Sequence, residues 1–204
     1  MDKKSQTAGD GEAPKDDEAR PGRRAARRSP RKPTRRSLEN AALAYLGRFA
    51  ATARGLEQVL MRRVHRAARA GVADDGEGAA LVSAIVARYR EAGLIDDAAF
   101  AEARARSLFA HGVALRAIRL RLAQKGVGPA EIERALAALA EQEGAGNARA
   151  LEVEAARRLA RRRRLGPWRD PARRGDMRER DLAALARAGF SYAIARAVVD
   201  GEDE

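Results

Sequence analysis

Residues 89–139, YREAGLIDDAAFAEARARSLFAHGVALRAIRLRLAQKGVGPAEIERALAAL, decide the fold. Their apolar positions recur every three to four residues, which is typical of amphipathic helices. Gly93 follows the first apolar run, at a point where a helix end favours a residue that can adopt positive φ, and Asp96 or Asp97 can cap the next helix. Gly126 marks a second stop of the same kind. The stretch therefore predicts a compact three-helix unit.

Similar signals for helix starts, helix ends and loops occur on both sides of this stretch. Upstream, Ser37 is expected to cap the first helix, and Gly55 is expected to separate that helix from the second. Residues 73–78 (ADDGEG) predict an exposed loop before a third helix. Downstream, the prolines and glycines of residues 165–175 (LGPWRDPARRG) predict another loop.

The turn of the central stretch recurs near the end of the chain, with Gly189 in the place of Gly126 and Phe190 in the place of Val127. A helix-helix-turn-helix pattern used three times, with almost no β-type alternation, predicts an all-α, elongated solenoid of three tandem three-helix repeats. The expected divisions are a disordered basic tail over residues 1–36 and repeats over residues 37–93, 94–143 and 144–204.

The composition points to an anionic partner. The net charge is +12 and the isoelectric point is about 11.1, so a polyanion is the first partner to consider, with an anionic membrane surface as the competitor. No apolar run approaches the roughly 18 residues of a spanning helix, and the N-terminus lacks an apolar signal core. Zero cysteines remove disulfides and thiolate chemistry. We expect a cytoplasmic protein that does not bind membranes.

The chain shows no pattern of an active site. Its only histidines, His65 and His111, lie within helical sequence, and no phosphate-binding glycine loop is present. Asp96 and Asp97 could be paired metal ligands, but adjacent residues at a helix entrance point apart, so capping explains them better. We expect no catalytic, cofactor-binding or metal-binding residue.

Cationic side chains are the candidate binding residues, because arginine suits bidentate contact with phosphate or carboxylate. A solvated face balanced by glutamates is the plainer alternative for each of them. The candidates are Arg88, Arg90, Arg104, Arg106, Arg116, Arg119, Arg121, Lys125, Arg161, Arg162, Arg163 and Arg164. Residues 20–36 add nine basic residues and no acidic one, either as a solubilising tail or as a polyanion-binding arm.

A helix-turn-helix DNA reader is a rival interpretation of residues 118–136, which contain two helices joined by a glycine turn. The second helix would enter the major groove by its first turn. Glu131 and Glu133 occupy that turn, where they would meet phosphates with like charge. This argues against sequence-specific reading by that helix.

The central stretch resembles the signature of the RecX family of recombinase regulators. The residues that carry the resemblance are Gly93, Asp96, Asp97, Phe100, Ile118, Leu122, Gly126, Ile132 and Leu136. The resemblance extends over about residues 38–200, and it implies tandem three-helix repeats. The basic N-terminal tail, residues 73–78 and the proline-bearing loop near the C-terminus depart from the family pattern.

Membership in this family would imply a monomer that binds a RecA recombinase filament and its DNA phosphates, without a cofactor. It would inhibit strand exchange and ATP hydrolysis, and so modulate recombination, DNA repair and the SOS response. The alternative is a general DNA- or RNA-binding protein without sequence preference. A third possibility, an enzyme acting on nucleic acid, would require a product whose formation metal chelation abolishes.

Overall fold

The computed structural model describes residues 31–201, so the part of the expected tail up to residue 30 lies outside the described residues. Within the described range the chain forms α-helices and two short 3-10 turns, and no strand. The helices are α1 (Arg35–Leu46), α2 (Ala53–Arg69), α3 (Asp75–Glu91), α4 (Asp97–Ala110), α5 (Leu115–Gln124), α6 (Pro129–Gln142), α7 (Ala148–Arg163), α8 (Arg174–Arg187) and α9 (Tyr192–Asp200).

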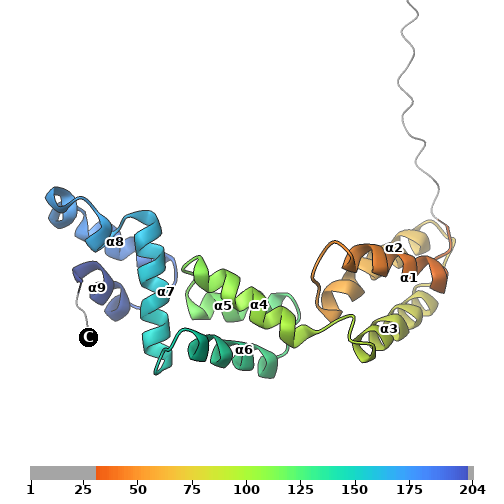
Figure 1. The fold of residues 1–204 in the computed structure, drawn as a ribbon. Helices are drawn as coiled ribbons and strands as arrows, with labels where there is room; N and C mark the ends of the chain where they lie inside the picture. Colours follow the sequence, from red (N-terminus) through yellow and green to blue (C-terminus); the bar gives the residue numbers. More distant parts are fainter. Residues whose placement is uncertain (1–30, 202–204) are drawn as a thin grey trace, which may run out of the picture.

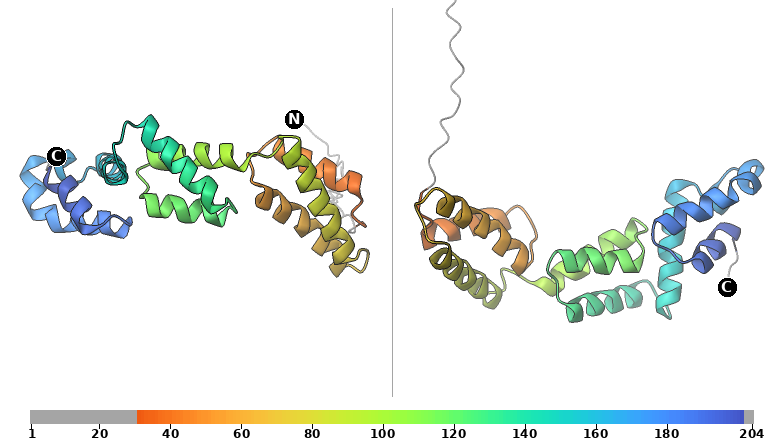
Figure 2. Two further views of the ribbon diagram at one scale, coloured as in Figure 1. Left: turned by 90° about the horizontal axis from the view of Figure 1, so that it is seen from below. Right: turned by 180° about the vertical axis from the view of Figure 1, so that it is seen from behind.

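The helices form three successive groups along an elongated molecule (Figures 1 and 2). We call α1–α3 the first unit, α4–α6 the second and α7–α9 the third. The first unit lies at one end, the second in the middle and the third at the other end, and α7 runs across the end of the second unit (Figure 1). The expected all-α solenoid of three-helix repeats is confirmed.

The turn between the second and third helices is the same in the last two units. Gly126 has φ 84°, and the Val127 N–H donates to the Leu122 carbonyl at 3.2 Å. Gly189 has φ 103°, and the Phe190 N–H donates to the Leu185 carbonyl at 3.2 Å. A positive φ followed by this hydrogen bond closes the end of a helix. The predicted match between the two turns is therefore confirmed in the backbone.

Two expected boundaries in the first unit are wrong. Thr34, not Ser37, is the N-cap of α1: its hydroxyl accepts from the Ser37 N–H at 3.2 Å, and the Ser37 hydroxyl accepts from the Thr34 N–H at 3.0 Å. Gly55 does not separate two helices but lies in the first turn of α2, which Thr52 caps by accepting the Gly55 N–H at 2.9 Å. Both errors arose because a stronger cap lies three residues earlier.

Two expected loops are also partly helical. Residues 73–78 are not a loop throughout, since Asp74 caps α3 and Gly78 is a buried residue of that helix. A Cβ at Gly78 would overlap the Val64 side chain, so this glycine permits α2 and α3 to approach each other. Residues 165–175 contain 3-10 turns at Gly166–Trp168 and Pro171–Arg173 before α8 begins.

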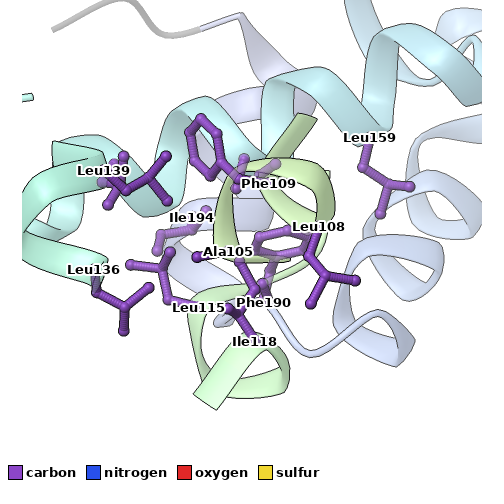
Figure 3. Packing of buried hydrophobic residues seen from close by; sticks show 14 of the residues in the cluster. Ala105, Leu108, Phe109, Leu115, Ile118, Leu136, Leu139, Leu159, Phe190 and Ile194 are labelled. Carbon is purple, nitrogen blue, oxygen red and sulfur yellow. The ribbon is translucent and has the colours of Figure 1, made fainter. Parts of the chain in front are cut away.

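The buried apolar residues form two separate clusters. One belongs to the first unit and includes Leu56, Leu60 and Ile95. The other runs without interruption through the second and third units, from Ala101 to Val199. Figure 3 shows part of this joined core, in which Leu115 and Ile118 of α5 lie close to Phe190. The second and third units therefore share one hydrophobic core, which the first unit does not enter.

Polar contacts join the first unit to the second. The Ala53 N–H, at the start of α2, donates to Asp97 Oδ1 of α4 at 2.8 Å. The Thr52 hydroxyl donates to the Lys125 carbonyl at 2.5 Å. Asp96 has a different role, because its Oδ1 accepts from the Ala99 N–H at 2.9 Å and caps its own helix α4. The two adjacent aspartates thus cap helices of different units.

The junction between the second and third units repeats this capping contact. The Leu115 N–H, at the start of α5, donates to Glu152 Oε2 of α7 at 3.0 Å. Burial raises the pKa of Glu152, although this hydrogen bond and the charge of Arg119 act in the opposite direction. Here the cap accompanies close packing: a Cβ at Gly112 would overlap the backbone of Leu159 in α7. In both junctions a carboxylate from the next unit therefore caps the second helix of the unit before it.

Candidate polyanion-binding surface

Two of the twelve predicted cations are held by the protein's own glutamates. Arg88 Nη2 of α3 lies 2.7 Å from Glu39 Oε1 of α1. Arg119 of α5 donates from Nε and Nη2 to both carboxylate oxygens of Glu133 in α6, at 2.8 and 3.0 Å. The hydrogen bond from Arg119 lowers the pKa of Glu133, and the same bond raises the pKa of Arg119. These two side chains join helices within their units.

The other ten predicted cations take no part in an ion pair within residues 31–201, and all ten are exposed. They are Arg90, Arg104, Arg106, Arg116, Arg121, Lys125, Arg161, Arg162, Arg163 and Arg164. The last four lie at the C-terminal end of α7, where their positive charge interacts favourably with the negative end of the helix dipole. Arg164 adopts φ 54°, so the helix ends on it in the left-handed conformation that glycine adopts at most other turns of this chain.

The free cations do not form one continuous stripe. Arg104 and Arg106 both lie on α4, but residues two apart on a helix point roughly 200° away from each other. Residues 161–163 likewise succeed one another at steps of roughly 100° around α7. Positive charge therefore faces several directions along the length of the molecule.

The structure adds Arg54, which was not among the predicted residues. Arg54 is the second residue of α2, and its exposed side chain lies over the glycine turn of the second unit, since a Cβ at Gly126 would overlap it. Arg116 is the second residue of α5 and reaches the corresponding turn of the third unit, 3.8 Å from the place of a Gly189 Cβ. A cation thus recurs at each junction. The incorrect reading of Gly55 as a helix boundary concealed this equivalence.

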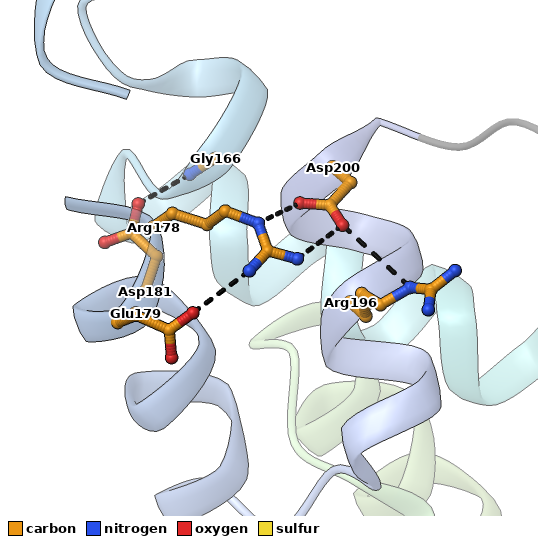
Figure 4. Close-up of polar contacts among 6 residues, drawn as sticks. All are labelled: Gly166, Arg178, Glu179, Asp181, Arg196 and Asp200. Atoms are coloured by element: carbon orange, nitrogen blue, oxygen red, sulfur yellow. Dashed lines mark hydrogen bonds and ion pairs between the residues drawn. The ribbon is translucent and has the colours of Figure 1, made fainter. Parts of the chain in front are cut away.

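Other arginines of the third unit stabilise its fold. Arg169 donates to both oxygens of Asp181, at 2.9 and 2.6 Å, and the Gly166 N–H donates to Asp181 Oδ2 at 2.9 Å. Burial raises the pKa of Asp181, but the bonds from Arg169 and Gly166 outweigh it and hold the pKa below its usual value. Arg178 binds both oxygens of Asp200 at 2.7 Å, which joins α8 to α9 (Figure 4).

Of the two carboxylates that argued against a major-groove reader, only Glu131 lies in the first turn of α6, because the helix begins at Pro129 and Glu133 is its fifth residue. Glu133 binds Arg119, and Glu131 Oε1 lies 2.9 Å from Arg134 Nη2. Each carboxylate is thus paired with an arginine, which weakens the like-charge repulsion of DNA phosphates that the sequence alone suggests.

The residues considered for catalysis have structural neighbours. His65 Nδ1 lies 3.0 Å from Asp75 Oδ1, and His111 Nδ1 lies 2.6 Å from the Ser107 carbonyl oxygen. Residues 31–201 contain no group of three or more His, Asp or Glu side chains placed to hold a metal ion. In the same range no helix is both long enough and apolar enough to cross a lipid bilayer.

Comparisons with known proteins agree on one family. The family model for the second three-helix domain of RecX matches residues 96–136. Regulatory protein RecX of Myxococcus xanthus (strain DK1622) is 46% identical over 189 residues, which cover 90% of this chain and 97% of that protein.

Two solved structures share the fold at 23% sequence identity. The crystal structure of RecX from Lactobacillus salivarius has a TM-score of 0.52 and covers 82% of this chain and 95% of its own. A crystal structure of regulatory protein RecX has a TM-score of 0.51 and covers 81% of this chain and 71% of its own.

Proposed function

This chain belongs to the RecX family, and from that membership we propose that it binds a RecA–DNA filament and inhibits the recombinase. The inhibited activities are strand exchange and the ATP hydrolysis that depends on the filament. The protein acts by binding rather than by catalysis. A preference for one state of the filament is sufficient, because a ligand shifts an equilibrium by its differential affinity for the two states.

The observation that carries this proposal is that ten of the twelve predicted cations are exposed and take no part in an ion pair within residues 31–201. Because no carboxylate of the described residues holds them, their side chains are available to phosphate and carboxylate groups of a partner. They recur from α3 to the end of α7, so an elongated partner that carries many anionic groups can engage several of them at once.

The test uses preformed RecA filaments and measures ATP turnover as the purified protein is added. Arg116→Glu with Arg121→Glu reverses two free cations of α5, and we expect this double variant to lose most of the inhibition. The matched control is Arg62→Glu with Arg66→Glu, which changes the net charge equally on exposed positions of α2.

We expect the control variant to inhibit as the parent does, with circular dichroism and urea unfolding used to check that both variants fold. Unchanged ATP turnover at a stoichiometric excess of the parent protein would contradict the proposed function. Equal inhibition by both variants would contradict the assignment of the surface to α5.

A second candidate function is general nucleic-acid binding, which the radial spread of the free cations around α4 and α7 favours. Binding through phosphates alone should weaken by orders of magnitude between about 50 and 200 mM salt. Filament recognition that includes protein contacts should decline less steeply and should require the recombinase. A salt titration with DNA alone and with filaments separates the two functions.

A further inference from the structure

A groove of about 740 Å³ lies between the first and second units. One wall is the end of α1 and the segment that follows it, with Tyr45, Leu46 and Phe49. The opposite wall is the outer face of α4, with Phe100 and Arg104. The groove therefore opens at the junction where the hydrophobic core is interrupted.

Aromatic side chains are concentrated in this groove. The chain has only eight aromatic residues, four Phe, three Tyr and one Trp, and three of them line the groove: Tyr45, Phe49 and Phe100. Phe49 is 56% exposed, and its ring centroid lies 5.3 Å from that of Tyr45. None of the three is fully buried: Phe49 is exposed, whereas Tyr45 and Phe100 are half-buried and also pack against the cores of the first and second units.

Positive charge borders these rings. Arg104 and Lys125 line the groove, and Arg54 lies beside Lys125 over the Gly126 turn. None of the three side chains takes part in an ion pair within the described part of the chain. One carboxylate, Asp96, also lines the groove, and its Oδ1 already accepts the Ala99 N–H at the positive end of α4. The groove thus combines three partly accessible rings with two lining cations, Arg104 and Lys125, and a third cation, Arg54, lies beside it.

We propose that this groove binds single-stranded nucleic acid, with unpaired bases against Tyr45, Phe49 and Phe100 and phosphates near Arg54, Arg104 and Lys125. Base stacking on aromatic rings beside a cationic track is the mode by which proteins bind single strands without sequence preference. An apolar peptide would use the rings and leave the cations unused. The charge pattern therefore favours a polyanion that also has flat, apolar faces.

The inference extends the proposed function, because it names a DNA contact made through bases instead of phosphates. It does not depend on the recombinase and is tested with the full chain alone. The probes are a fluorescently labelled 15-residue oligothymidylate and an abasic strand of the same length and charge, and binding is measured by fluorescence anisotropy. We expect the oligothymidylate to bind roughly tenfold more tightly than the abasic strand.

The variant that isolates stacking is Phe49→Leu, which keeps an apolar side chain but removes the ring face. Because Phe49 is more than half exposed and follows the last turn of α1, this change leaves the fold intact, which circular dichroism checks. We expect it to weaken oligothymidylate binding several-fold and leave abasic binding unchanged. The matched control, Tyr192→Leu, alters an aromatic residue that is 65% exposed in the third unit and should change neither.

Three results would overturn the proposal. The first is equal affinity of the parent protein for the two strands. The second is an equal effect of the Phe49 and Tyr192 replacements. The third is a Phe49→Leu protein that binds oligothymidylate normally but inhibits filaments less, because the groove then takes a protein segment. Loss of stacking with filament inhibition intact would support the groove and leave the proposed function standing, so the two ideas can fail separately.

Discussion

The two junctions between units use the same polar device but different packing. In each, a carboxylate of the following unit accepts the first N–H of a second helix: Asp97 for Ala53, and Glu152 for Leu115. Only the second junction adds a shared hydrophobic core. The capping bonds fix where each unit sits, whereas the continuity of the core determines which units unfold together. The first unit is therefore one cooperative body, and the second and third units together form another.

The largest effect on stability is expected from replacing a glycine at the second junction, with a glycine that has no close neighbours as the control. Gly112 has φ 68°, and a Cβ there would overlap the Leu159 backbone across the second junction, whereas Gly71 has φ 69° with no heavy atom within 4 Å of such a Cβ. Gly71→Ala should cost about 1 kcal/mol of unfolding free energy from the left-handed backbone alone. Gly112→Ala should cost about 3 kcal/mol, because overpacking adds to that strain.

Urea unfolding measures both variants, and Gly71→Ala is the control for backbone strain. Equal losses in the two proteins would mean that α7 can move away from Gly112 at little cost. The packing of Gly112 against α7 would then contribute little to the stability of the second junction.

A smaller effect is expected from separating the roles of the adjacent aspartates. Asp97→Ala removes the acceptor of the Ala53 N–H at the start of α2, where Thr52 remains the N-cap, and Asp96→Ala removes the N-cap of α4. Each should cost about 1 kcal/mol, the usual value of an N-cap. Amide hydrogen exchange distinguishes them: Asp97→Ala should accelerate exchange at Ala53, and Asp96→Ala should accelerate it at Ala99. Faster exchange at Ala99 alone in both variants would show that the contact from Asp97 does not hold the junction.

The smallest expected effect is the pH dependence of stability that Glu152 gives to the second junction. Burial raises the pKa of Glu152, so the folded protein retains this proton more strongly than the unfolded chain does. Stability from this group is therefore lost as the pH rises past the usual glutamate range, near 4.3, toward the raised value. Glu152→Gln keeps an oxygen that accepts the Leu115 N–H and has no proton to lose, so its urea midpoint should rise relative to that of the parent as the pH increases above the usual glutamate pKa.

Glu133→Gln is the control with the opposite sign. The hydrogen bond from Arg119 lowers the pKa of Glu133, so the parent gains stability from this group above the usual glutamate pKa and loses it as the pH falls through the lowered value. The urea midpoint of the Glu133→Gln variant should therefore decrease relative to that of the parent as the pH rises. The same pH trend in both variants would contradict the assigned pKa directions.

Local signals in the sequence predicted most of the fold. The turn at Gly126 and Gly189 could be predicted because a glycine, which tolerates positive φ, and the apolar residue after it both lie within one short segment. Gly55 and Gly78 were misread because the same residue type also occurs inside helices: Gly55 follows an unrecognised cap at Thr52, and Gly78 makes room for Val64. The second case requires knowledge of which helix lies opposite.

The candidate surface was less predictable, because the partner of a charged residue can lie far away in the sequence. Glu39 binds Arg88 from 49 positions away, and Glu133 binds Arg119 from 14 positions away. No local pattern distinguishes these arginines from Arg90 or Arg121, which have the same composition around them. The capping of Ala53 by Asp97, 44 positions apart, was missed for the same reason.

The short connection after α3 limits how the two bodies can move. Ile95 is buried in the core of the first unit, and the next residue, Asp96, is the N-cap of α4. One peptide bond, about 3.8 Å between successive Cα atoms, thus separates an anchor in one body from an anchor in the other. Any rearrangement between them is a swivel about this point that leaves the spacing of the bodies nearly fixed. A partner that binds both bodies can therefore change the angle between them but hardly the length of the molecule.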